Sequence, residues 1–158
     1  MSVAVRPASP GDLELIYALI RELAVYERLK HELVATGDDI GRLLFGGAPS
    51  AWCDIAEVNG EGAGFSLWFY SVSTFLGRRG LNLEDVFVRE ASRGQGAGLA
   101  LLKALARRCV DEGLGRLEWA VLDWNAPSIA FYDALGAETM DGWTTRRLTG
   151  EALRELAG

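Results

Sequence analysis

A glycine-rich turn carries the first residues whose types and spacing could do chemistry: Arg93-Gly94-Gln95-Gly96-Ala97-Gly98-Leu99. Glycine lets the main chain approach a ligand closely and adopt backbone angles that other residues resist. The turn stands directly before a long helical pattern, so the free N–H groups of the first helical turn face outward. Together with the helix dipole, these groups form an anion site that suits a pyrophosphate.

Two other phosphate-binding motifs are excluded at this turn. A dinucleotide-binding fingerprint needs glycine at position 99 after Gly94 and Gly96, and Leu99 stands there. A P-loop needs Gly-Lys followed by Ser or Thr, and the sequence lacks it. An isolated glycine triplet can also be a connection that binds nothing. The strand predicted before the turn and the amphipathic helix predicted after it favour a ligand-binding turn.

The strands and helices that must position this turn are predicted from the spacing of apolar residues and from the positions of Gly and Pro. Apolar runs predict strands over 3–5, 51–58, 63–71, 81–88 and 117–122, with one or two more within 139–148. Helical spacing predicts one helix that opens at Ser9-Pro10 and others over 38–44, 96–112, 125–135 and 151–156. This order indicates an α/β fold with a mixed sheet and helices on both faces, not a doubly wound parallel sheet.

The helix predicted over 96–112 is expected to bury one face. That face carries, at helical spacing, Leu99, Leu102, Ala106, Cys109 and Val110. Cys109 is therefore expected to be a buried, reduced thiol. Cys53 is far from it in sequence, and the two cysteines form no metal-binding spacing and no disulfide framework, although a bridge between them stays open.

Length and composition indicate one globular domain over residues 1–158, since 49% of the residues are apolar and 24% are charged. The net charge of −6 argues against a nucleic-acid partner, which needs a basic face. No apolar run approaches the length of a membrane span, and the N-terminus lacks a signal-peptide pattern. A cytoplasmic protein without a membrane partner is expected.

Two motifs in order resemble one superfamily. Arg93-x-x-Gly96-x-Gly98 after the strand 83–88 looks like the acetyl-CoA motif of the GNAT acetyltransferases, and 124–132 with Leu135-Gly136-Ala137 resembles their second CoA-binding element. Two motifs in the right order and spacing are more specific than either alone. Four more stretches are similar to the diamine (spermidine/spermine) acetyltransferases, especially the thialysine-acetylating branch: 24–27, 73–78, 120–125 and 150–158. The resemblance covers nearly the whole chain and is weakest between 29 and 62.

The resemblance implies the GNAT acyl-CoA N-acyltransferase fold, with acetyl-CoA in a V-shaped opening between two splayed parallel strands, 81–88 and 117–122. It implies CoA contacts from the glycine-rich turn and from Val86, Phe87, Val88, Asn125, Pro127 and Ser128. The first three would pair with the pantetheine arm through their main chain, while their side chains are ordinary core. Asn125 also suits a helix N-cap. Arg93 either adds positive charge at the pyrophosphate or is a solvated surface arginine.

The resemblance also implies that Tyr132 protonates the departing CoA thiolate, a step that a phenol near the sulfur can perform. The alternative is a core tyrosine that packs beside Ile129. His31 is the only histidine in the sequence, so a histidine-based triad is excluded, and a surface role for it is favoured. No metal is expected, and neither cysteine lies in a motif that would activate it.

Acidic residues supply the implied amine site. Glu84 and Asp85 interrupt an apolar strand, where carboxylates are costly without partners. The family uses the position of Glu84 for the amine substrate, directly or through water, and a catalytic acidic group there can hold a cationic amine or help remove its proton. A structural carboxylate bonded to neighbouring backbone is the preferred interpretation of Asp85. Tyr26 and Glu27 match a substrate-contacting pair near the end of the first helix. The alternative for that pair is an exposed helix end with Arg28 and Lys30 nearby to neutralise Glu27.

Asp141 lies where the family has another acidic substrate contact, although this chain is shorter there. The resulting hypothesis is an enzyme, an N-acetyltransferase that acts by direct attack of a small-molecule primary amine on acetyl-CoA in a ternary complex. Backbone N–H groups near Val86 would polarise the thioester carbonyl. The relatives imply a homodimer. Two alternatives stay open: an acetyltransferase for a protein lysine or N-terminus, and a non-catalytic acetyl-CoA sensor.

Overall fold

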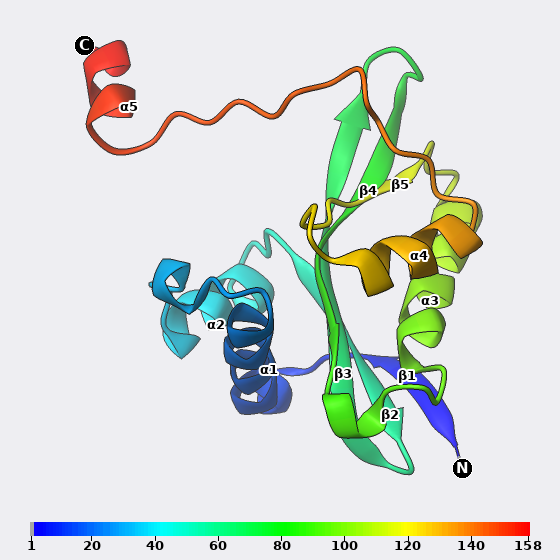
Figure 1. The fold of residues 1–158 in the computed structure, drawn as a ribbon. Helices are drawn as coiled ribbons and strands as arrows, with labels where there is room; N and C mark the ends of the chain where they lie inside the picture. The colour runs from blue at the N-terminus through cyan, green and yellow to red at the C-terminus, as the bar shows by residue number, and fades with distance from the viewer. Residues whose placement is uncertain (1) are drawn as a thin grey trace. The chain divides into compact units, whose positions relative to one another are not determined.

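The structure is a computed structural model that describes residues 2–158 (Figure 1). It contains two compact units, one up to Ala120 and the other from Val121 to Gly158. Each unit is described by itself. None of the helices within the described residues is long and apolar enough to cross a membrane.

The first unit is built on one five-stranded sheet in the order β1-β2-β3-β4-β5. The strands are β1 (Val3–Pro7), β2 (Trp52–Val58), β3 (Glu61–Ser73), β4 (Arg78–Val88) and β5 (Leu117–Glu118). β1 to β4 pair antiparallel, and β5 runs parallel to β4. The predicted mixed sheet is confirmed. β4 begins at Arg78, three residues before the predicted strand 81–88, because the β3–β4 hairpin keeps pairing as far as Ser73 and Arg78.

Helices cover both faces of this sheet (Figure 1). α1 (Leu13–Tyr26), preceded by a 3-10 turn (Pro10–Asp12), and α2 (Gly37–Phe45) bury one face. α2 begins after Thr36, whose Oγ1 accepts a hydrogen bond from the Asp39 N–H at 3.2 Å. The core between these helices and the sheet includes Ile16, Leu19, Leu23, Ile40, Leu44, Ile55, Phe65, Leu67 and Phe87.

α3 (Ala97–Glu112) covers the opposite face, and its buried stripe differs from the predicted one. The buried residues are Ala97, Leu101, Leu102, Leu105 and Cys109, whereas Val110 is 80% exposed. The prediction was wrong about Ala106 and Val110, since the helix packs along its i, i+4 row from Ala97 rather than along the row that passes through Val110. Gly113 ends the helix in the left-handed conformation, at φ 67°.

The second unit contains α4 (Ala126–Ala134) and α5 (Gly150–Ala157). Strands were predicted over 117–122 and within 139–148, and both predictions were largely wrong: β5 ends at Glu118, and 139–148 contains no strand. A strand needs a neighbour whose main chain satisfies its N–H and C=O groups. Within the described residues β4 offers such a neighbour to β5 only at Leu81 and Asn82.

Candidate active site

The glycine-rich turn has the backbone that its sequence predicts. Gly94 and Gly96 adopt φ values of 76° and 89°, in the left-handed region that strains other residues. A Cβ built at either position would meet no atom within 4 Å, so the main chain here is open to a ligand. Gly96 is the N-cap of α3, and no side chain caps the helix at this end. The first N–H groups of α3 are thus available to an anion.

Beyond Asn82, one edge of β4 has no strand partner within the described residues. β5 pairs with β4 only at Leu81–Leu117 and Asn82–Glu118. The main chain of β4 therefore presents an open edge over 83–88, which includes Val86, Phe87 and Val88. An extended arm with amide groups can add to such an edge as a further strand. This edge leads directly to the glycine-rich turn, because only a short 3-10 turn (Glu90–Ser92) lies between them.

A β-bulge lies in the middle of this open edge. Leu67 of β3 pairs with Asp85, while its neighbour Trp68 pairs with Leu83, so Glu84 is the inserted residue. Opposite residues of two strands share a face. Asp85 therefore shares the α1 face with Leu67, which belongs to the core under α1, and the bulged residue Glu84 is exposed.

Three carboxyl groups gather at this place, and we call Glu27, Glu84 and Asp85 the acid cluster. Burial raises the pKa of Asp85 to about 7, and the nearby charges of Glu84 and Glu27 add to the shift. Burial also raises the pKa of Glu27, which follows the last residue of α1. The Asp85 carboxyl accepts no backbone hydrogen bond within residues 2–158, contrary to the structural role preferred from the sequence. A cationic amine would relieve the repulsion within this cluster.

The sequence did not predict the face of the sheet on which Asp85 lies, because strict alternation along 83–88 puts Asp85 on the same face as Leu83. The bulge at Glu84 moves it to the other face. The available signal was the pair of adjacent carboxylates in an apolar strand, which the sequence analysis noted without predicting the bulge.

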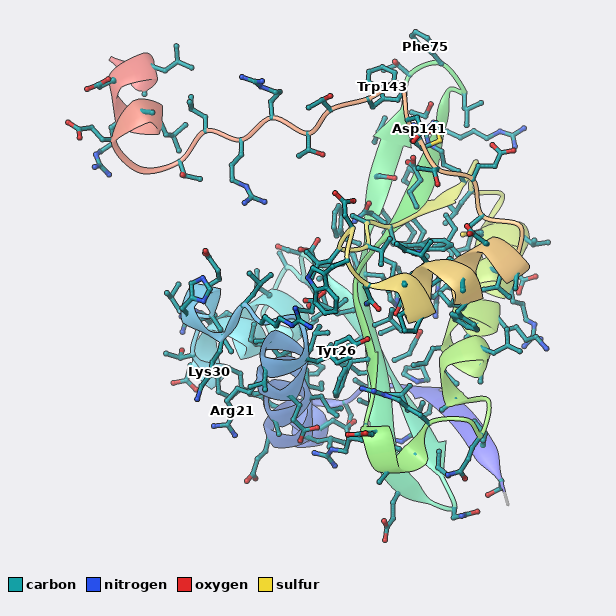
Figure 2. All side chains as sticks on the ribbon, viewed as in Figure 1. Arg21, Tyr26, Lys30, Phe75, Asp141 and Trp143 are labelled. Carbon is teal, nitrogen blue, oxygen red and sulfur yellow. The ribbon has the colours of Figure 1, made fainter. Side chains whose placement is uncertain are left out.

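The side chain of Arg93 contacts both β4 and α1. Its Nε donates a hydrogen bond to the Val88 carbonyl at 2.9 Å. Its guanidinium carbon lies 5.0 Å from the centroid of the Tyr26 ring and 5.5 Å from that of the Phe87 ring. Tyr26 lies between α1 and the sheet (Figure 2). Arg93 is an exposed surface arginine whose side chain is held by three contacts, and its proposed charge contribution at the pyrophosphate stays a prediction.

The second unit holds the remaining predicted site residues. Asn125 is buried and is the N-cap of α4, since its Oδ1 accepts from the Ser128 N–H at 3.4 Å, and Pro127 lies in the first turn. Tyr132 lies on α4, where its ring is 5.6 Å from that of Phe131. Asp141 is exposed in the segment without regular structure. The N-cap prediction for Asn125 is confirmed, and the roles of Tyr132 and Asp141 stay predictions.

The two cysteines lie apart and are both free and buried. Cys53 belongs to the core under α1, and Cys109 lies on α3. Burial raises the pKa of both thiols, so neither is poised as a nucleophile at neutral pH. The predicted buried, reduced Cys109 is confirmed.

A mixed sheet with a splayed parallel edge, followed by a glycine-rich turn at a helix N-terminus, defines a class of acyl-CoA-using transferases. The model of the Acetyltransferase (GNAT) family matches residues 14–137, and the chain belongs to this family. It is an N-acetyltransferase. The family uses acetyl-CoA as the acetyl donor.

Relatives of known activity share the full length of the chain. It is 40% identical to a thialysine N-epsilon-acetyltransferase of Bos taurus over 167 residues, which cover 99% of this chain and 98% of that protein. It is 32% identical to an L-ornithine N5-acetyltransferase of Arabidopsis thaliana, with 96% and 86% of the two chains covered. Among solved structures, an integron cassette protein from the mobile metagenome of V. cholerae superposes with a TM-score of 0.81 at 25% identity, covering 99% and 98% of the two chains.

Proposed function

We propose that this chain transfers the acetyl group of acetyl-CoA to a primary amine of a small molecule, a diamine, polyamine or thialysine-like compound. The observation that carries the proposal is the acid cluster, two of whose members lie on the strand that leads into the glycine-rich turn. Three carboxyl groups in one partly buried place suit a substrate with a cationic amine. The thialysine and ornithine acetyltransferases among the relatives act on such amines by name.

In the proposed reaction the acetyl-CoA thioester reacts directly with the amine. The turn 94–99 binds the pyrophosphate, and the open edge of β4 pairs with the pantetheine arm and polarises the carbonyl oxygen through its N–H groups near Val86. The acid cluster holds the amine and accepts its proton, and the pKa of about 7 at Asp85 suits a group that must release and accept protons near neutral pH.

The amine nitrogen then bonds to the carbonyl carbon, and the bond from that carbon to sulfur breaks. We propose that Tyr132 delivers its phenolic proton to the leaving thiolate, with Asn125, Pro127 and Ser128 adding CoA contacts. Support for these roles comes from the motif that the second unit carries, 124–132. Tyr26 and Asp141 complete the proposed amine contacts.

A thiol-release assay with a panel of acceptors tests this proposal. Release of free CoA with diamines, ornithine or thialysine supports it. Release only with peptides supports a protein acetyltransferase, and tight CoA binding without turnover on any acceptor supports a sensor. In the same assay, Tyr132→Phe should lower kcat by roughly 10²-fold while acetyl-CoA binding persists. Unchanged turnover would remove Tyr132 from the mechanism.

The two ends of α3 offer a matched test of the turn. Gly96 and Gly113 both have left-handed φ values, and a Cβ at either position meets nothing within 4 Å. Gly96→Val and Gly113→Val should therefore strain the backbone to a similar extent. Only Gly96→Val should weaken acetyl-CoA binding, by at least about tenfold, when measured by calorimetry. Equal affinities in the two variants would show that the turn is not the pyrophosphate site.

We further propose a homodimer in the cytoplasm. The second unit leaves large apolar side chains exposed, including Trp143 at 81% and Leu156 at 76%, and such surface is typical of contacts with another chain. Two free cysteines fit a reducing compartment. Sedimentation velocity at several concentrations tests the oligomeric state, and a single species at the monomer mass contradicts the dimer.

A further inference from the structure

Two arginines of the connection between β4 and α3 hold one face of α1. Arg89 Nε and Nη2 each lie 3.0 Å from an oxygen of the Glu22 carboxylate, in a bidentate pair. Arg93 lies over the ring of Tyr26. Glu22 and Tyr26 are one helical turn apart, so the two arginines contact neighbouring points of the same helix face.

The Arg93 contact joins three elements. Its Nε is bound to the Val88 carbonyl at the end of β4, and its guanidinium stacks near the rings of Tyr26 and Phe87, whose centroids are 6.2 Å apart. Cations over aromatic rings at these distances attract, and the attraction is stronger where water is partly excluded. Phe87 is buried and Tyr26 is partly buried, so the guanidinium sits against a fixed apolar surface.

Arg93 and Tyr26 each lie next to one of the two proposed binding sites. Arg93 directly precedes Gly94 and Gly96, the residues that shape the anion site. Tyr26 directly precedes Glu27, a member of the acid cluster. The Arg93–Tyr26 stack is thus a short path of contacts between the place proposed for the pyrophosphate and the place proposed for the amine.

We infer that Arg93 is a positioning residue that holds the glycine-rich turn against Tyr26, in the arrangement that binds acetyl-CoA. This inference rests on the proposed function. Loss of the Tyr26 ring must then weaken acetyl-CoA binding, because the turn loses the surface against which Arg93 holds it. A solvent-facing phosphate ligand at position 93 would show no such dependence on Tyr26.

The test measures the Kd of acetyl-CoA by calorimetry with no amine present. Tyr26→Leu removes the ring and should weaken acetyl-CoA binding roughly three- to tenfold. Tyr26→Phe keeps the ring and should stay within about twofold of the unchanged protein. Arg93→Gln should match Tyr26→Leu, and the double variant should be no weaker than either single variant, because both remove the same contact.

Arg21→Gln is the matched control. Arg21 stacks over Tyr17 of the same helix, also at 5.0 Å, and Figure 2 shows its side chain on the side of α1 away from Tyr26. This variant removes an equivalent cation–π contact and should leave the Kd of acetyl-CoA unchanged. Circular dichroism and thermal melting establish that each variant is folded.

The outcomes separate the inference from the proposed function. Tyr26→Leu with unchanged acetyl-CoA affinity, or losses from Tyr26→Leu and Arg93→Gln that add in the double variant, overturns the positioning role while acetyl transfer by the unchanged protein stands. Failure of the unchanged protein to bind acetyl-CoA overturns both. If Tyr26→Leu does not fold, Arg93→Gln is compared with Arg93→Lys. A loss of acetyl-CoA affinity in Arg93→Gln that is smaller in Arg93→Lys supports the stack. Acetyl-CoA affinities in both variants equal to that of the unchanged protein contradict it.

Discussion

Two carboxylates on opposite faces of the same sheet, Asp54 and Asp85, show how surroundings decide what an acidic group can do. Both have a raised pKa, and burial is the largest cause for each. Near Asp54, the charge of Arg108 and the indole of Trp68 act against the shift. Near Asp85, the neighbours that act on its pKa are the acids Glu84 and Glu27, and they increase the shift.

The two surroundings differ in what they leave unsatisfied. On the α3 face, Asp54 lies opposite Ser66 in a packed region, and Arg108 stacks over Trp68 at 4.7 Å. On the α1 face, Asp85 has like charges around it and stands on an open strand edge. The negative charge of a carboxylate with a cation nearby is already compensated within the protein. A carboxylate among other acids instead favours binding of a cationic ligand. Asp54 is accordingly structural, and Asp85 belongs to the proposed amine site.

The largest expected effect is on turnover. Asp85→Asn should lower kcat/KM for a diamine by roughly 10²-fold or more, since it removes both a charge that attracts the amine and a proton acceptor. Asp54→Asn, a change of the same chemistry on the other face, should leave kcat/KM within about threefold. Steady-state assays at pH 8 measure both. Similar losses of kcat/KM in the two variants would contradict the different roles of Asp85 and Asp54.

A smaller effect concerns the stability of the α3 face. Arg108→Gln should lower the free energy of unfolding by about 1–3 kcal/mol at pH 8, because it leaves the buried Asp54 carboxylate without its cation. Asp54→Asn added to this variant should recover part of the loss, because the neutral amide needs no cation. Urea unfolding measures the free energies. A double variant that is as unstable as the sum of its parts contradicts an interaction between Asp54 and Arg108.

The smallest expected effect is a pH dependence of stability at Asp85. Its pKa is about 7 in the folded protein against 3.8 for a free aspartate, so the folded state binds more protons than the unfolded state between these values. Stability therefore falls as pH rises from about 4 to about 7, and removal of the charge prevents the fall. Asp85→Asn should raise Tm by on the order of 5 °C at pH 8 and by much less at pH 4. A Tm difference that is the same at both pH values would contradict the raised pKa.

Local patterns were enough to predict the glycine-rich turn and the elements beside it. Glycine at positions 94 and 96 has a backbone reason that a sequence shows directly, and Asn125 is an N-cap as its residue type indicates. The antiparallel strands before the turn followed from apolar runs, and β2 turns into β3 at Asn59-Gly60, both of which have positive φ. Such features depend on neighbours in the chain.

The features that the sequence did not predict depend on distant partners. Whether 119–122 becomes a strand depends on how far β4 keeps pairing on that side, and this pairing ends after Asn82. The bulge at Glu84 depends on the register of β3 against β4, which a single strand does not reveal. The stack of Arg93 on Tyr26 joins residues 67 positions apart. For the same reason the sequence did not show that Asp85 lies on the face of the sheet that α1 covers.

The open edge of β4 also has a consequence for the behaviour of the protein in solution. An unpaired strand edge invites another chain to add to it, which is a common route to aggregation. Here the edge carries two adjacent acidic residues and a bulge, both of which discourage such growth. The residues assigned to amine handling thus also oppose edge-to-edge pairing with another chain while no acetyl-CoA lies along the edge.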